Sequence, residues 1–439
     1  MKTTLEHISP VKKKLMVEIE AGEVNRKFDE TYKTLGKKAR IPGFRPGKVP
    51  RKILEKRLGD QVLEDVTKAL INETLPRAMQ ETETYPLSVP VVENETLLKM
   101  DQTFKYAATM EVRPTFEPKG YMDLEVEKEN LVVTDEDLNR QLEEIRKNYG
   151  KLNAVDDDRD IRENDYVLID YEGFEGGKPL EGIRSSNFLL RIGSNDFHPD
   201  FENALVGHKK GDKVEITVNF EKGHYNTKLA EKAVNFKVTV LELKVMELPE
   251  LNDEFVKKLG AEFTNLDDLK KKLKEEMVQR EKDRIDRELK GRLLKKISDN
   301  LEFELPPSLV ESEITRAIEN LRQNLIRAGA SLEKAGLKEE KLREDFRASS
   351  EKKVKNLLIL GEIARRENLT IDDKELSEGF NELAQNIGQD PQVISRYYEE
   401  NQMEDSFRAK LLEEKTLNYL VKGAKILEVD SDKLTRQME

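Results

Sequence analysis

The sequence contains no cysteine among its 439 residues and only four histidines. Without cysteine the chain forms no disulfides, offers no thiolate ligand to a metal and holds no cysteine nucleophile. The histidines are His7, His198, His208 and His224. No carboxylate cluster with metal-ligand spacing accompanies His198 or His224 in the sequence. We therefore expect no metal site and no cofactor, and most metal-dependent and triad mechanisms are excluded.

Long apolar runs and an N-terminal apolar segment are also missing. No stretch approaches the roughly 18 apolar residues of a membrane span, and the opening MKTTLEHISP lacks a signal-peptide core. We therefore expect no membrane partner and a cytoplasmic location. The phosphate-binding pattern G-x-x-x-x-G-K-[ST] is absent as well, so no nucleotide cycle is expected.

Charged residues, in contrast, make up 37% of the chain, well above the roughly 25% of an average globular domain. The hydrophobic share is also 37%, which is low. A chain of this length corresponds to about three domains, and its polarity predicts a large surface relative to its cores.

Residues 1–113 are predicted to form an α+β unit. Alternating apolar residues predict strands at 11–20 and 104–112, and helical spacing predicts helices around 24–35 and 53–70. Between the helices stands IPGFRPGKVP, in which five of ten residues are Pro or Gly. Residues 33–57 carry ten basic side chains against one acid, Glu55, so this loop belongs to a positive patch.

The loop has two interpretations. Phe44 can fill the core of its own domain while the lysines merely solvate a helix. Alternatively, Phe44 is the aromatic anchor of a rigid docking finger, and Arg45 binds phosphate or carboxylate through two hydrogen bonds. The composition of the loop does not decide between these interpretations.

The rest of the chain changes pattern twice. A capping pattern at Thr134 and the apolar stripe after it predict a linker helix that ends at Gly150. Residues 151–245 hold eight of the 23 glycines and nine of the 27 aromatic residues, with alternating runs typical of a small β-rich domain. After Pro249 the pattern is almost wholly helical, with apolar stripes over 265–300 and from Leu411 to Leu427.

GFRPGKVP, at 43–50, resembles the signature loop of the trigger factor family of bacterial ribosome-associated chaperones. The likeness covers the whole chain. Residues 151–245 look like the family's FKBP-type peptidyl-prolyl isomerase domain, and ELPELNDEF at 247–255 looks like its entry into the C-terminal helical domain. In that family the loop contacts the ribosome, which implies ribosome-binding residues Gly43, Phe44, Arg45 and Lys48.

The resemblance implies a multidomain α+β protein. A ribosome-binding α+β domain would occupy 1–113, and a linker helix within 114–150 would join the helical body. An inserted FKBP-like β-rich isomerase domain would occupy 151–245. The segment 246–439 would form a discontinuous all-α chaperone domain with arms.

An FKBP-type isomerase needs no nucleophile. The X-Pro bond rotates against a barrier of roughly 18–20 kcal/mol because the twisted amide loses resonance, and an apolar pocket that fits the twisted form lowers it. Carried over by motif, the pocket residues are Tyr171, Phe188, Ile192, Phe197, His198, Phe201, Tyr225 and Phe236. The alternative is that these aromatic residues are only the core of a β-barrel.

Four positions depart from the family pattern. Leu180 stands where phenylalanine is common, and the positions of Asp200, Ala204 and Glu231 are expected to hold glycine. The pocket tyrosine is displaced to Tyr225, beside His224. We expect an intact fold, with a charge at Asp200 beside an apolar slot that weakens proline binding.

The sequence therefore predicts an ATP-independent chaperone that docks on the large ribosomal subunit near the exit tunnel, shields unfolded nascent polypeptides and carries an isomerase domain. Whether ribosomal RNA joins ribosomal protein in docking, and whether molecules off the ribosome form homodimers, stays open. The alternatives are a free-standing prolyl isomerase with a helical substrate-recruiting region, and a basic-loop RNA-binding protein. The sequence lacks the aromatic strands typical of RNA-binding domains, which disfavours the RNA-binding alternative.

Overall fold

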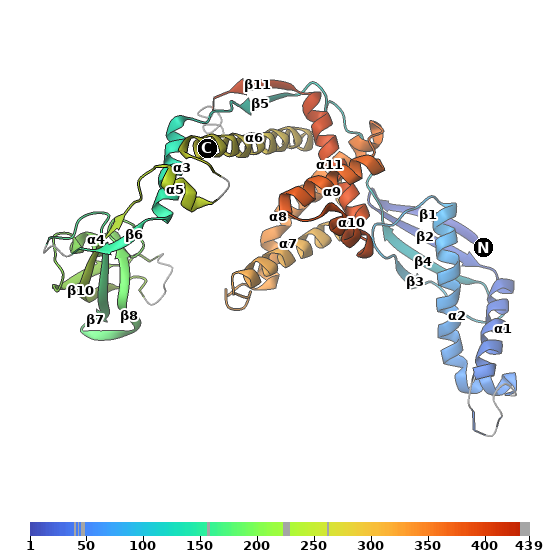
Figure 1. Cartoon of the computed structure of the whole chain (residues 1–439). Coiled ribbons are helices and arrows are strands. Elements are labelled where there is room, and N and C mark those ends of the chain that lie inside the picture. Colours follow the sequence, from blue (N-terminus) through green and yellow to red (C-terminus); the bar gives the residue numbers. More distant parts are fainter. Residues whose placement is uncertain are drawn as a thin grey trace. The chain divides into compact units, whose positions relative to one another are not determined.

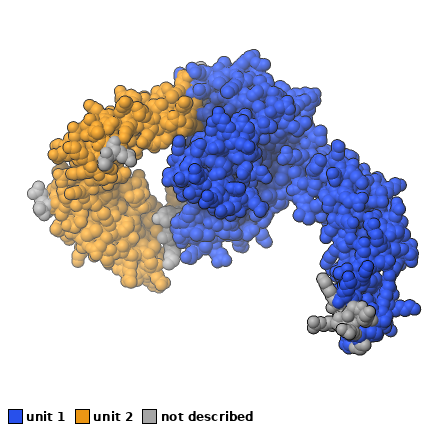
Figure 2. Space-filling view, turned by 45° about the vertical axis from the view of Figure 1, so that its right-hand side comes forward, with its two compact units in different colours: residues 1–129, 286–439 blue, residues 130–285 orange. Residues whose placement is uncertain are grey.

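The structure is a computed structural model that describes residues 1–38, 41–42, 44, 49–155, 159–222, 229–260 and 263–430. Figure 1 traces the chain and labels its elements. The chain divides into two compact units, which Figure 2 colours separately. One unit comprises residues 1–129 and 286–439, and the other comprises residues 130–285, so the second unit is inserted in the sequence of the first.

The chain begins with a four-stranded antiparallel sheet in the order β1-β2-β4-β3. The strands are β1 (Lys2–Ser9), β2 (Lys12–Ile19), β3 (Val91–Asn94) and β4 (Phe104–Glu111). Helices α1 (Ala21–Lys38) and α2 (Arg51–Glu81) follow β2. The two strands and two helices predicted from periodicity are confirmed. The edge strands β1 and β3 were not predicted, because most of their residues are not buried and their alternation is weak.

The apolar stripes of this α+β part meet in one core. Leu15 and Val17 from β2 are fully buried together with Phe28 of α1 and Val66 of α2. The alternating apolar residues of the strand and the apolar residues at helical spacing in the helices therefore face the same interior, as the pattern predicted. In the chain, the Pro/Gly loop lies between α1 and α2.

Residues 286–430 form the helical part of the first unit. Its helices are the end of α6 (Leu266–Asp299), α7 (Pro307–Arg327), α8 (Glu339–Arg366), α9 (Asp373–Ile387), α10 (Pro391–Glu400) and α11 (Glu404–Lys422). The C-terminal part of the α6 stripe is buried against α8, as Leu293 and Ile363 illustrate. Helices α9 and α11 pack tightly at Gly379, where a Cβ atom would lie 2.8 Å from the Leu411 side chain.

The predicted helical stripe through Leu427 is wrong at its end. Helix α11 ends at Lys422, and β11 (Lys425–Val429) pairs in parallel with β5 (Glu125–Glu129). The amide of Asp123 donates to the carbonyl of Gly423 at 2.8 Å, which begins this connection. The partner strand lies 300 residues earlier in the chain and leaves no local periodic signal, so periodicity could not reveal the pairing.

The inserted unit contains a five-stranded antiparallel sheet flanked by helices. Its strands are β6 (Lys151–Ala154), β7 (Tyr166–Glu175), β8 (Lys178–Arg191), β9 (Lys213–Asn219) and β10 (Ala233–Glu247), in the order β6-β10-β7-β8 with β9 on β10. Helix α4 (Pro199–Leu205) lies between β8 and β9 in the chain. The predicted β-rich segment is confirmed.

Three helical segments complete this unit: α3 (Asp135–Asn148), α5 (Asp253–Leu259) and residues 266–285 of α6. They bury Leu142, Val256 and Leu269 in a common cluster. A capping box starts α3, in which the Thr134 hydroxyl accepts from the amide of Asp137 at 3.1 Å. The linker helix predicted from this pattern is confirmed.

Candidate functional site

Aromatic side chains from four elements and a loop converge inside the β-rich domain. Tyr171 comes from β7, Phe188 from β8, Phe197 from the loop after β8, Phe201 from α4 and Phe236 from β10. The Phe197 ring centre lies 4.2 Å from that of Phe201, 5.2 Å from that of Tyr171 and 5.4 Å from that of Phe236. Most pairs meet edge to face, the arrangement that aromatic quadrupoles favour.

Burial divides this cluster into a floor and a wall. Phe201 and Phe236 are fully buried, and Ile192 is 1% exposed. Tyr171, Phe188, Phe197 and His198 are half-buried. The first three residues are therefore core residues, whereas the other four keep part of their surface accessible.

His198 is fixed at the start of α4. Its Nδ1 accepts a hydrogen bond from the amide of Asp200 at 3.2 Å, and its ring lies 5.4 Å from that of Phe220. The Asp200 side chain is 69% exposed and lies 3.8 Å from His198 Nδ1. The Asp200 carboxylate is therefore well hydrated in the free chain, and its weakening effect on proline binding stays a prediction.

The other departures from the family pattern differ in their consequences. Leu180 and Ala204 pack against the domain core. Asp200 and Ala204 lie in a helix, where glycine has no conformational advantage. Glu231 has a φ of 60°, the left-handed region that glycine adopts at no steric cost. Tyr225 and His224 lie outside the described residues.

Sequence reasoning missed Glu202, which is 1% exposed. Its carboxylate accepts hydrogen bonds from the amides of Gly193 at 2.8 Å, Asn195 at 3.1 Å and Phe197 at 3.2 Å. In the sequence Glu202 looks like an ordinary polar helix residue, and only the structure shows that it is buried.

A second buried acid, Asp165, has a different environment. Burial would raise its pKa, but hydrogen bonds from Arg159 at 2.6 and 2.8 Å and from the amide of Arg162 lower the pKa of this carboxyl below its usual value. Its partners belong to residues 159–162, before β7, so Asp165 organises that segment.

In the N-terminal hairpin the structure describes only part of the signature loop. Phe44 is 39% exposed, and its amide donates to the carbonyl of Ile41 at 3.1 Å. An exposed phenylalanine disfavours the interpretation that Phe44 fills the core of its own domain. Gly43, Arg45 and Lys48 lie outside the described residues.

The basic residues beside the loop fall into two groups. Arg51 contacts Asp29 at 2.5 Å and Glu55 at 2.8 Å, and its guanidinium lies 5.1 Å from the Tyr32 ring centre. These hydrogen bonds raise the pKa of Arg51. Arg51 therefore holds α1 to α2. The exposed cations that form no ion pair with any described residue are Lys33, Lys37, Lys52, Lys56 and Arg57.

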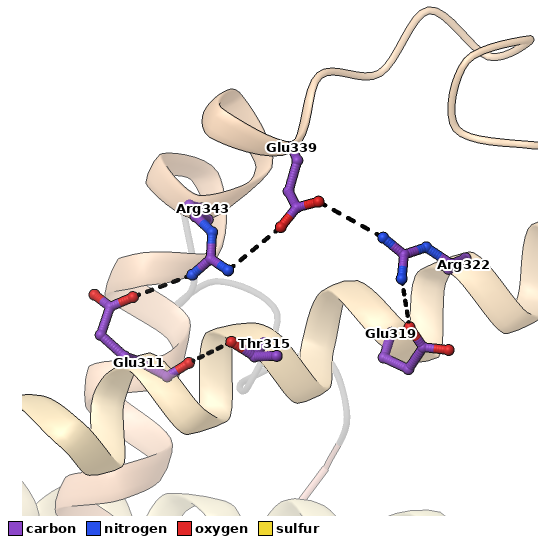
Figure 3. Close-up of polar contacts among 6 residues, drawn as sticks. All are labelled: Glu311, Thr315, Glu319, Arg322, Glu339 and Arg343. Atoms are coloured by element: carbon purple, nitrogen blue, oxygen red, sulfur yellow. Dashed lines mark hydrogen bonds and ion pairs between the residues drawn. The ribbon is translucent and has the colours of Figure 1, made fainter. Parts of the chain in front are cut away.

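Helices α7 and α8 form a hairpin that ion pairs join along one side, as Figure 3 shows. Glu311 contacts Arg343 at 3.2 Å and Arg347 at 2.7 Å, both on α8. Glu339 contacts Arg343 at 3.3 Å and Arg322 of α7 at 3.6 Å. The core beneath contains Ile314 and Leu358 among others. We call this hairpin, residues 307–366, the α7–α8 arm.

Across the described ranges, no group of three or more His, Asp or Glu side chains is placed to hold a metal ion. No described helix is long and apolar enough to cross a bilayer.

The inserted β-rich domain with its aromatic site, together with the family profiles that match the chain, defines a class of protein: a chaperone with an inserted FKBP-type peptidyl-prolyl isomerase domain. The family profile described as FKBP-type peptidyl-prolyl cis-trans isomerase matches residues 157–241. Profiles described as bacterial trigger factor protein and as its C-terminus match residues 1–145 and 265–422.

Relatives over the full length settle the family. The trigger factor of Geotalea uraniireducens is 37% identical over 99% of this chain and 100% of its own length. That of Halalkalibacterium halodurans is 33% identical over 94% of this chain and 96% of its own. The chain belongs to the trigger factor family, whose members are chaperones that bind ribosomes and nascent chains.

A solved trigger factor chaperone has the same fold. It aligns with a TM-score of 0.51 at 24% identity over 96% of this chain and 99% of its own. The expected fold class and the FKBP-type isomerase are confirmed by these comparisons.

Proposed function

We propose that the Pro/Gly loop docks this chaperone on the large ribosomal subunit near the exit tunnel, where it shields nascent chains without a nucleotide cycle. The docking residues are Gly43, Phe44, Arg45 and Lys48. The observation that carries this proposal is the exposed Phe44 at the end of a hairpin whose neighbouring lysines form no ion pair with any described residue.

The charges of the hairpin support an anionic partner. Five exposed cations near the loop can each neutralise a phosphate or a carboxylate. We propose that these lysines and Arg57 contact ribosomal RNA, while Phe44 enters an apolar pocket of ribosomal protein. Arg51 contributes to neither contact because Asp29 and Glu55 already occupy its guanidinium.

The docking proposal is tested by ribosome co-sedimentation. Replacing Phe44, Arg45 and Lys48 together by alanine should reduce binding more than about tenfold, since an aromatic anchor and two charges are lost. The matched control is Leu97→Ala with Lys99→Ala, which removes a 78% exposed leucine and an exposed lysine elsewhere in the domain. Unchanged binding by the triple variant would favour the free-standing isomerase instead.

The salt dependence of ribosome binding tests whether these lysines contact RNA phosphates. If the lysines contact phosphates, the logarithm of affinity should fall linearly with the logarithm of salt concentration. Lys52→Ala and Lys56→Ala should make this slope shallower, whereas Arg51→Ala should leave it unchanged and lower the thermal stability of the hairpin.

We propose that the slot for proline is formed by a wall of Tyr171, Phe188, Phe197 and His198 over a floor of Ile192, Phe201 and Phe236, with Tyr225 at its rim. The half-buried rings support this assignment, because part of their apolar surface is accessible to a ligand. Such a surface binds the twisted amide, which has lost its polar resonance form, better than the planar one.

The slot is tested with Phe197→Ala, because this ring is half-buried and its loss should perturb the core less than loss of buried Phe201. We expect kcat/KM on a proline tetrapeptide to fall about tenfold or more, since the wall ring contacts the floor and Tyr171. Phe174→Ala is the matched control, since this half-buried ring of β7 contacts Lys237 and stands outside the cluster. Equal losses in both variants would refute the slot.

We further propose the domain boundaries 1–113, 114–150, 151–245 and 246–439, a cytoplasmic location and homodimers off the ribosome. Exposed apolar side chains of the helical body support client binding by that body. They are Ile326, Ile387, Val393 and Tyr397, all more than half exposed. Sedimentation of the free chain across a concentration series tests the dimer.

A further inference from the structure

We infer that Glu202 is a positioning residue for the isomerase: its buried carboxylate holds the loop between β8 and α4 and thereby sets Phe197 against the slot. The inference rests on the slot proposed above. Glu202 itself does not face the slot, because 99% of its surface is covered and its oxygens point to the loop backbone.

The burial of this carboxylate requires compensation. No Lys, Arg or His side chain among the described residues pairs with Glu202, and an unpaired buried charge is costly. Three backbone amides donate to it, at 2.8 Å from Gly193, 3.1 Å from Asn195 and 3.2 Å from Phe197, and the Ser194 hydroxyl lies at 3.5 Å. Amide donors in this number replace the water that the carboxylate loses on folding.

The loop backbone is shaped for this task. Gly193 has a φ of 86° and Asn195 a φ of 60°, both left-handed, whereas most residues avoid that region. Alternation of left-handed residues turns successive N–H groups toward one point, which is the geometry of an anion-binding nest. Here the anion is the carboxylate of Glu202.

Helix α4 supplies both the buried carboxylate of Glu202 and the floor residue Phe201. Phe201 precedes Glu202 in α4 and lies 4.2 Å, ring centre to ring centre, from Phe197. The amide of Phe197 bonds to Glu202 Oε1. One carboxylate thus fixes the wall ring relative to the floor ring and to Tyr171, 5.2 Å away. Loosening it should change the fit to the twisted amide.

Glu202→Gln tests the inference in the full chain. Glutamine keeps the size but loses the charge, and its NH2 group cannot accept from the loop amides. We expect kcat/KM on succinyl-Ala-Ala-Pro-Phe-p-nitroanilide to fall about tenfold, with at least tenfold faster hydrogen exchange at the amide of Phe197. Glu202→Asp keeps the charge and should recover part of both losses.

Asp165→Asn is the matched control, since it neutralises another buried carboxylate of the domain that contacts Arg159 and not the loop. It should leave kcat/KM per folded molecule within about twofold. The inference is overturned if Glu202→Gln keeps full activity, or if Asp165→Asn loses as much. If the unaltered protein shows no activity, the slot proposal fails, and the exchange rate at Phe197 alone decides whether Glu202 holds the loop.

Discussion

Glu231 adopts a backbone conformation that suits glycine. Its φ is 60°, and among the described residues its exposed side chain forms an ion pair only with Lys222, at 3.5 Å, whose side chain is 87% exposed. A side chain in the left-handed region costs about 1 kcal/mol or more, whereas such an exposed ion pair contributes little. Glu231→Gly should therefore raise the free energy of unfolding of the β-rich domain by about 0.5–1 kcal/mol, after the entropic cost of glycine in the unfolded chain.

Thermal unfolding of the full chain and hydrogen exchange along β9 and β10 measure this effect. Glu231→Ala is the control, because it removes the charge and the contact but keeps a Cβ in the left-handed region. Its stability should equal that of the unaltered protein. If the alanine variant gained as much stability as the glycine variant, the charge of Glu231, and not its backbone conformation, would be the destabilising feature.

At the same scale, sequence identified the members of the aromatic site but not their roles. The motif placed Phe201 and Phe197 together, yet only burial distinguishes the floor ring from the wall ring. Glu202 escaped notice because its role depends on backbone amides of a loop, and no side-chain pattern encodes them. Glu231 was noticed as a missing glycine, and its positive φ gives the physical reason.

Helices and strands were predicted well where one local period dominates. Helices α1, α2 and α3 and strands β2, β4, β7 and β10 follow their apolar patterns. The pair β5–β11 was missed because each strand is five residues long and their pairing joins distant segments. The one-stripe α6 was recognised, but not that Leu269 and Leu293 lie in separate cores.

The α7–α8 arm offers a test at the scale of one element. Glu311 makes two contacts to α8 from a partly exposed position: one with Arg343, which Figure 3 shows, and one with Arg347. Exposed pairs are each worth about 0.2–1 kcal/mol and are screened by salt. Glu311→Gln should therefore speed hydrogen exchange at the start of α8 about threefold to tenfold at low salt, and hardly at 1 M salt.

Glu319→Gln provides the comparison for the arm. Glu319 contacts Arg322 and Gln323 within α7 and reaches no residue of α8 among those described. Its replacement should leave exchange in α8 unchanged at either salt concentration. If Glu311→Gln acts equally at low and high salt, packing of the side chain, and not its charge, joins the helices.

At the scale of the whole molecule, the charge distribution separates two tasks. The basic side chains of residues 33–57 are gathered around one loop, while the chain as a whole carries a net charge of −12. A basic end attracts an anionic surface, and an acidic remainder keeps exposed apolar groups in solution. The exposed Ile326, Ile387, Val393 and Tyr397 lie in residues 286–430, outside the inserted unit.

Client binding should therefore survive loss of the isomerase domain. Strand β6 starts at Lys151 and pairs with β10 through Glu247, so the two ends of this domain are adjacent. A variant that joins Gly150 to Leu248 through a short Gly/Ser linker leaves α3, α5 and the helical body in place. It should suppress aggregation of a denatured client in light scattering within about twofold of the full chain, because dispersed apolar groups bind weakly and independently.

The isolated segment 151–247 is the matched comparison for the deletion. With only a proline-sized apolar slot, it should isomerise a short proline peptide but leave aggregation of the client almost unchanged. If the deletion variant is folded by circular dichroism and yet no longer suppresses aggregation, while the isolated segment does, the isomerase domain is the client-binding surface and the helical body only positions it.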